Sequence, residues 1–154
     1  MRRLLTVLAL SLANTAAWAQ TPLTISGLVA QPVTLTMADL RKLAATSVQA
    51  MQMSGQGPVK LDCSGPALAT VLATAKLALP PAKNSSLRHT LLIAADDGYA
   101  VALSLGEIDP NFGDAAPLVA TQCNGQQLEA PRLVMPDDKS ASRSVHGIVS
   151  IKIN

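Results

Sequence analysis

The sequence predicts an α+β fold with mixed or antiparallel sheets and two or three short helices. Segments that alternate apolar and polar residues, the pattern of half-buried strands, recur along the chain. Apolar residues at helical spacing stand out in only two segments, residues 37–44 and 68–75. Glycine-containing turn sequences separate successive strand segments. This arrangement favours antiparallel hairpins over a regular alternation of strands and helices.

The first predicted elements are a strand and a capped helix. Residues 23–29 alternate apolar and polar positions around Gly27, and Pro32 then marks a turn. Thr36 and Asp39 have the spacing of a capping box, in which each side chain bonds a backbone N–H of the other residue. The sequence therefore predicts a short helix over residues 37–44.

Two strands and the second helix follow. Residues 48–53 and 59–62 read as strands separated by a glycine-containing turn at 55–57. Ser64-Gly65-Pro66 supplies a capping residue and a proline suited to a first helical turn. One apolar face of the predicted helix then comprises Leu68, Val71, Leu72 and Ala75.

The second half of the chain predicts two hairpins and further strands. The first hairpin turns at Asp96-Asp97-Gly98, and the second turns at Asn124-Gly125, residues that tolerate positive backbone angles. Residues 136–142 form a polar loop. The strand segments are 89–95, 99–103, 117–121, 126–128, 132–135 and 147–153.

The N-terminus has the three parts of a signal peptide. Arg2 and Arg3 precede an apolar run over residues 4–12, and the small-residue stretch ends in Ala17-Trp18-Ala19. We expect a signal peptide over residues 1–19 and a mature domain over residues 20–154. The apolar run is too short to span a bilayer, and no later stretch is long enough, so we expect a soluble periplasmic or secreted protein.

Charge and composition narrow the function classes. Without Arg2 and Arg3, the twelve Lys and Arg residues become ten, which balance the ten Asp and Glu residues. This balance argues against a nucleic-acid partner. Once Trp18 is removed with the signal peptide, the aromatic residues are Tyr99 and Phe112, which are too few for an aromatic binding platform.

Cys63 and Cys123 are the two cysteines of the chain. In an oxidising compartment they are candidates for a disulfide, which would close a loop of about 60 residues and stabilise the fold by roughly 4 kcal/mol. Alternatively, Cys63 lies just before a predicted helix start, which would lower its pKa and favour a thiolate ligand or nucleophile.

Several short sequences follow one another with a specific order and spacing. They are Leu23-Thr24-Ile25-Ser26-Gly27, Leu35-Thr36-Met37-Ala38-Asp39-Leu40, Ser64-Gly65-Pro66-Ala67-Leu68 with Val71-Leu72, Asp97-Gly98-Tyr99 with Gly106-Glu107, Asn124-Gly125, Arg132-Leu133-Val134-Met135-Pro136-Asp137, and residues 145–153. This series resembles the molybdopterin-binding domain of the sulfite oxidase-like oxidoreductases, in its short exported bacterial form. The resemblance implies that fold, a possible molybdopterin cofactor and oxidoreductase chemistry.

The resemblance also points to a position for a metal ligand. Catalytic members hold molybdenum through the pterin dithiolene and a cysteine thiolate, a soft ligand. That cysteine lies in a pattern close to Gln-Cys-Ala-Gly-Asn, and the corresponding stretch here is Gln52-Met53-Ser54-Gly55-Gln56. Met53 therefore occupies the ligand position with a neutral thioether, which argues against oxo transfer of the family type. Cys63, ten residues on, is the remote alternative.

Cationic residues near the C-terminus are the candidate cofactor-binding residues. By resemblance, the segment Arg143-Ser144-Val145-His146 contributes to holding the pterin phosphate, and His146 stands where catalytic relatives tend to have lysine. These cations could also bind another anion such as sulfite. The alternative is that they are solvated loop cations. The candidate set is Arg132, Lys139, Arg143 and His146.

Other chemistry has weaker support. His89, His146 and the two cysteines lack the close spacing of a zinc site. The Asp pairs at 96–97 and 137–138 lie in predicted turns, where aspartate commonly bonds its own backbone. Two hypotheses remain: a small molybdopterin-type oxidoreductase, or a cofactor-free periplasmic module that binds an anionic small molecule or a protein partner on the same fold.

Overall fold

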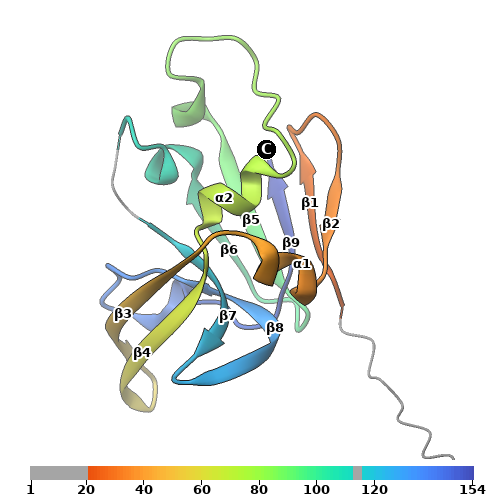
Figure 1. Ribbon diagram of the computed structural model, residues 1–154. Coiled ribbons are helices and arrows are strands. Elements are labelled where there is room, and N and C mark those ends of the chain that lie inside the picture. The colour runs from red at the N-terminus through yellow and green to blue at the C-terminus, as the bar shows by residue number, and fades with distance from the viewer. Residues whose placement is uncertain (1–20, 113–115) are drawn as a thin grey trace, which may run out of the picture.

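The computed structural model describes residues 21–112 and 116–154, so the predicted signal peptide lies outside the described residues. The described chain folds into a five-stranded and a four-stranded sheet, with two short α-helices (Figure 1). The predicted α+β class is confirmed.

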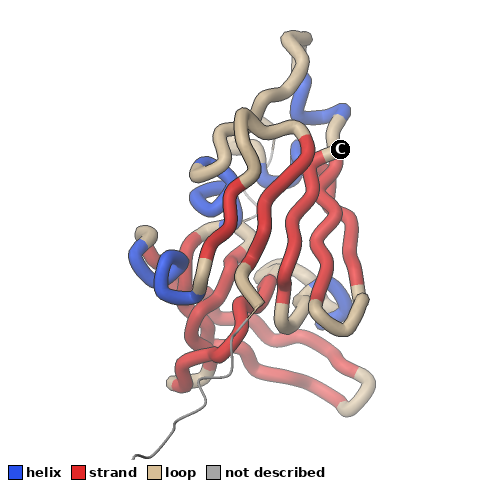
Figure 2. Tube along the Cα trace, turned by 90° about the vertical axis from the view of Figure 1, so that its right-hand side faces the viewer, coloured by secondary structure: helices blue, strands red, loops and turns tan. Residues whose placement is uncertain are grey.

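The five-stranded sheet is mixed. Its order is β2-β1-β9-β5-β6, and its strands run side by side in the upper part of Figure 2. β1 pairs parallel with β9, whereas the other neighbours are antiparallel. The strands are β1 (Leu23–Gly27), β2 (Val33–Leu35), β5 (Thr90–Ala95), β6 (Ala100–Ser104) and β9 (Ile148–Ile153).

The four-stranded sheet is antiparallel throughout, in the order β3-β4-β7-β8. The β7–β8 hairpin confirms the one predicted at Asn124-Gly125, and both residues adopt the positive φ angles expected of its turn, 50° and 77°. The other predicted hairpin, at Asp96-Asp97-Gly98, is β5–β6 of the five-stranded sheet. The strands are β3 (Ala45–Ser54), β4 (Gly57–Pro66), β7 (Leu118–Cys123) and β8 (Gln126–Val134).

Each of the two α-helices connects one sheet to the other along the chain. In α1 (Met37–Lys42), Thr36 and Asp39 form the predicted capping box. α2 (Leu68–Ala73) buries Leu68, Val71 and Leu72, as predicted. Three 3₁₀ turns complete the described elements: η1 (Ser85–Arg88), η2 (Leu105–Ile108) and η3 (Ala141–Arg143).

The expected cap of α2 was wrong. Ser64, Gly65 and Pro66 continue β4, and the N-cap is Ala67, which makes no side-chain capping bond. Gly65 is needed because β4 crosses close to β7: a β-carbon there would overlap the carbonyl oxygen of Val119 and lie 2.9 Å from Ala120 Cα. The glycine therefore serves strand packing rather than a helix start.

Two apolar clusters hold the sheets. The larger one fills the space between the five-stranded sheet, both helices and one face of β7 and β8. The smaller one lies against the four-stranded sheet and includes Leu61, Cys63, Leu118, Ala120, Cys123 and Val134. No helix in the described part of the chain is long and apolar enough to cross a membrane.

Candidate functional site

Residues 136–147, here named the C-terminal loop, carry three of the four candidate cations and join β8 to β9. One side of the loop meets the end of β3: Met53 N–H donates to Lys139 O at 2.8 Å. The other side of the loop contacts the β5–β6 hairpin, where Tyr99 Oη donates to Ser142 O at 2.8 Å. A hollow lies on each side, one lined by Met53 and Ser140, the other by Tyr99 and His146.

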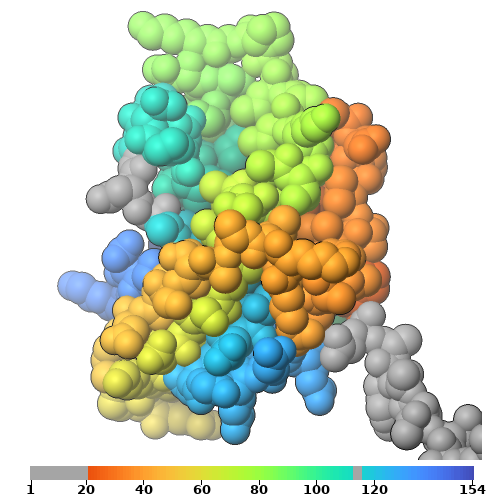
Figure 3. Space-filling model, in the orientation of Figure 1, coloured from red at the N-terminus to blue at the C-terminus, as the bar shows by residue number. Residues whose placement is uncertain are grey.

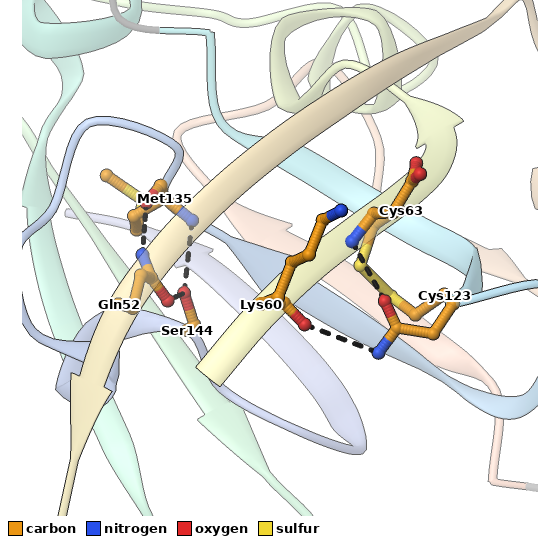
Figure 4. The surroundings of a disulfide bond; sticks show 8 residues. Gln52, Lys60, Cys63, Cys123, Met135 and Ser144 are labelled. Carbon is orange, nitrogen blue, oxygen red and sulfur yellow. Dashed lines mark hydrogen bonds between the residues drawn. A yellow bond between two sulfur atoms is a disulfide. The ribbon is translucent and has the colours of Figure 1, made fainter. Parts of the chain in front are cut away.

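Gln52 fastens this loop to β3. Its side chain is fully buried, its Nε2 donates to Met135 O, and its Oε1 accepts from Ser144 Oγ at 2.9 Å. Met135 N–H in turn donates to Ser144 Oγ at 3.2 Å. Figure 4 shows these three residues converging behind β3. Because Nε2 and Oε1 of Gln52 both have buried hydrogen-bond partners, this side chain positions the loop.

Met53 lies at the exposed end of β3, with 56% of its surface accessible. Its neighbours in the hollow are serine, glycine and alanine residues, not thiolates or imidazoles. The position to which the resemblance assigns the metal ligand is thus accessible but carries only a neutral sulfur.

Arg143 is engaged by two carboxylates. Its Nε and Nη2 donate to the two oxygens of Asp138 at 2.8 and 2.7 Å, and Nη1 donates to Glu107 at 3.1 Å. These hydrogen bonds, of which those to Asp138 have the largest effect, raise the pKa of Arg143 above its usual range. The guanidinium charge is therefore matched within the protein, and Arg143 ties the C-terminal loop to η2 instead of presenting a free fork to an anion.

Arg132 and His146 form the one pair of candidate cations that the described structure brings together. Leu133 N–H donates to Val145 O at 2.8 Å, which sets the adjacent residues 132 and 146 beside each other. Burial lowers the pKa of Arg132, and its buried Nε has no hydrogen-bond partner among the described residues. Desolvation, and then the Arg132 charge, lower the pKa of His146 even though this side chain is exposed on one side.

Lys139 contributes backbone rather than side chain to the arrangement. Its carbonyl accepts the Met53 N–H, and its side chain is exposed with no ion pair to a described residue. The four candidate cations thus have three different environments. Among the described candidate cations, only Arg132 combines a charge with a buried donor that lacks a hydrogen-bond partner.

The cysteines are joined to each other. Cys63 on β4 and Cys123 on β7 are paired across the sheet, with their α-carbons 4.0 Å apart, and they form a disulfide (Figure 4). The expected disulfide is confirmed. The alternative role of Cys63 as a thiolate ligand is wrong for this structure, because its sulfur is bonded and the residue is 1% exposed.

The donor set therefore does not fit a thiolate-ligated metal. A disulfide sulfur and a thioether carry no charge, whereas the ligand that the family resemblance implies is an anionic thiolate. Within residues 21–112 and 116–154, no three His, Cys, Asp or Glu side chains gather in a metal-binding arrangement either.

Sequence reasoning missed Gln52, Ser144 and Tyr99 as site residues. Gln52 belongs to the quoted ligand motif beside Met53, and strand alternation places one of these two neighbours inward. Ser144 and Tyr99 lie in segments that the family resemblance quotes, but no local pattern indicates their hydrogen bonds, because their partners lie 92 and 43 residues away. A separate apolar groove of about 260 Å³ between α2 and η2 also had no signal, and none of the candidate site residues lines it.

Comparison with known proteins agrees with the fold. The chain is similar to the sulfane dehydrogenase SoxCD from Paracoccus pantotrophus, with a TM-score of 0.69 and 20% sequence identity. The match covers 86% of this chain but 37% of that chain, so the protein spans little more than a third of the length of this relative. No curated protein matches the sequence.

The sequence itself also matches a known family. Residues 10–153 match the family described as "Oxidoreductase molybdopterin binding domain". This match covers nearly the whole chain and confirms the expected resemblance. The protein belongs to the oxidoreductase molybdopterin-binding domain family.

Proposed function

We propose that the mature protein is an exported binding domain that keeps the molybdopterin-binding fold without holding thiolate-ligated molybdenum. The disulfide carries this proposal, because Cys63 and Cys123 are the only cysteines in the sequence and their sulfur atoms are bonded to each other. Met53 supports it further, since a neutral thioether at the family's ligand position cannot replace the charge of a thiolate. Neither the disulfide nor Met53 supports oxo transfer.

The proposed ligand is an anionic small molecule that binds at Arg132 and His146. Arg132 Nε, which has no partner among residues 21–112 and 116–154, supports this site, because such a donor gains a hydrogen bond when an oxyanion reaches it. The adjacent imidazole adds a second donor, and its proton becomes more favourable once an anion offsets the Arg132 charge. Arg143 has a structural role in this proposal.

Metal analysis tests the cofactor-free role. Protein purified from its native compartment should contain molybdenum at far less than one atom per chain. A content near one atom per chain would overturn the proposal.

A paired substitution tests whether only the thiolate is missing. Met53→Cys places a thiolate at the family's ligand position, and Met51→Cys places one two residues earlier on the same face of β3, at a similarly exposed site. We expect neither variant to acquire molybdenum in a host that makes the cofactor. Acquisition by Met53→Cys alone would show that the pterin site survives and would favour a molybdopterin-binding role.

Phosphate titration tests the anion site. Backbone NMR shifts should place phosphate at Arg132 and His146, and Arg132→Ala should abolish these shifts. The matched control is Arg143→Ala, which should keep them while losing about 1 kcal/mol of stability with its partly exposed ion pairs. Loss of binding in the control but not in Arg132→Ala would reverse the assignment.

Export has its own measurement. N-terminal sequencing of the protein recovered from the periplasm or medium should begin at Gln20. Recovery of the intact N-terminus from the cytoplasm alone would contradict export.

A further inference from the structure

The outer edge of β3 differs from the other three sheet edges of the described chain. Exposed edge strands offer unpaired N–H and C=O groups to other chains, and proteins limit this by short strands, charges or proline. β2 has three residues and β6 has five. β8 carries Glu129, Pro131 and Arg132. β2 and β8 are therefore protected against strand addition, and β6 offers an edge only half as long as β3.

β3 has none of these protections. It is ten residues long, with the sequence Ala-Thr-Ser-Val-Gln-Ala-Met-Gln-Met-Ser, and contains no charge and no proline. It is the outermost strand of the four-stranded sheet in Figure 1 and lies at the surface in Figure 3. Met51 and Met53, exposed by 63% and 56%, add apolar surface beside this edge.

The free edge has a defined length. Met53 N–H points away from β4 and donates to Lys139 O, and Met53 bridges Ser140 in parallel. Because strand backbone groups alternate in direction, the N–H and C=O groups of Ser47, Gln49 and Met51 point the same way as those of Met53. They form no backbone hydrogen bond to the described residues. The C-terminal loop thus occupies the end of the edge and leaves residues 45–51 open.

This open window suits pairing with itself. An antiparallel pair of identical strands related by a twofold axis at Val48 uses all of residues 45–51 in both copies. On the exposed face, this register sets Met51 opposite Ala45 of the second copy and Gln49 opposite Ser47. Large side chains therefore meet small ones, and no like charges meet across the axis.

We propose that two copies of this protein associate through residues 45–51 of β3, antiparallel, to join their four-stranded sheets into one. The inference does not depend on the proposed anion site, which involves β8 and the C-terminal loop. The interface is small, so the dimer is weak and its population depends on concentration.

Sedimentation velocity of the disulfide-bonded mature protein tests the association over a wide concentration range. We expect a reversible shift from monomer to dimer, with slowed amide hydrogen exchange at Ser47, Gln49 and Met51 in the dimer. A monomer at every concentration would overturn the proposal, and so would a dimer without added protection on β3.

Charge substitutions test the twofold geometry. Ser47 is exposed and lies near its own copy across the proposed axis, so Ser47→Lys alone and Ser47→Glu alone should each remain monomeric. A mixture of the two variants should recover heterodimers. The matched control, Thr34→Lys, places the same charge at an exposed position of the β2 edge and should dimerise like the unsubstituted protein.

Ser47 lies outside both apolar clusters, so its variants should have the same melting temperature as the unsubstituted protein. A change in dimerisation would therefore not result from unfolding. Dimers that persist in either single variant would refute pairing through this edge. Failure of the mixture to form heterodimers would refute the antiparallel twofold arrangement.

Discussion

Gln52 and Met53 are neighbours on β3 with opposite surroundings. Gln52 is fully buried, whereas more than half of Met53 is exposed, because successive side chains of a strand point to opposite faces. The buried glutamine bonds Met135 and Ser144 of the segment that follows β8. The residue that organises the site is therefore the neighbour of the one that the family motif singles out.

Replacing Gln52 should destabilise the fold. Gln52→Leu keeps the side-chain volume but leaves the Met135 carbonyl without its side-chain donor and the Ser144 hydroxyl without its acceptor, so we expect a loss of about 3 kcal/mol. Chemical denaturation measures the change. Gln49→Leu is the control, since Gln49 is exposed on the same strand and should change stability by less than about 0.5 kcal/mol.

A double substitution separates this network from general damage. Combining Gln52→Leu with Ser144→Ala should cost less than the two single changes added together, because both remove the same hydrogen bond. Strict additivity would contradict a shared network.

His146 should make stability depend on pH. Its folded pKa is below the ordinary value near 6.5, so above that pH the imidazole is neutral in both the folded and the unfolded state. As the pH falls below 6.5, the unfolded chain takes up the proton first, and the free energy of unfolding decreases until the folded pKa is passed. NMR titration of His146 measures the folded pKa directly.

Two controls accompany this titration. His146→Gln should flatten the part of the stability curve just below pH 6.5, and phosphate should raise the His146 pKa if the anion binds beside Arg132. An imidazole pKa at or above 6.5 without phosphate would contradict the desolvated environment.

At the scale of elements, local sequence signals were most reliable where a turn or cap needs particular residues. Thr36 with Asp39 and Asn124 with Gly125 formed the expected cap and turn. The segment Ser64-Gly65-Pro66 was misassigned because its residues suit a helix start by composition, while β7 holds them in a strand. Tertiary pairing overrides a local preference of this size.

Gly65 offers a test of that strand packing. Gly65→Ala should lower stability by about 3 kcal/mol, because the added β-carbon would overlap the backbone of β7, which cannot move aside as a side chain could. Gly55→Ala is the control: nothing lies within 4 Å of its β-carbon position. Thermal unfolding of the two variants should differ clearly, and equal melting temperatures would contradict the close approach of β4 and β7.

At the scale of the whole molecule, the disulfide links residues 60 positions apart across adjacent strands of the smaller sheet. It lies within the second apolar cluster, away from the larger core. The bond therefore stabilises the part of the fold from which Gln52 and Met53 extend, and it removes both thiols from metal chemistry.

Removing the disulfide should be costly but should not change the fold. Cys63→Ala with Cys123→Ala should lower the free energy of unfolding by up to about 4 kcal/mol, because the unfolded chain loses a loop constraint. Denaturant titration measures this loss. Thiol counting under denaturing conditions should find no free thiol in the unsubstituted protein, and two titratable thiols would contradict the bond.

The sequence by itself determined most strands, both helices, two hairpin turns and the family, because these depend on local periodicity, turn chemistry and the order of short motifs. Only the tertiary structure decided that Arg143 is neutralised by Asp138 and Glu107, that Arg132 lies beside His146 with a buried donor that bonds no described residue, and that Cys63 is bonded to Cys123. It also decided which strand edge stays open. These features depend on contacts between residues that are distant along the chain, and no local pattern records which distant groups meet.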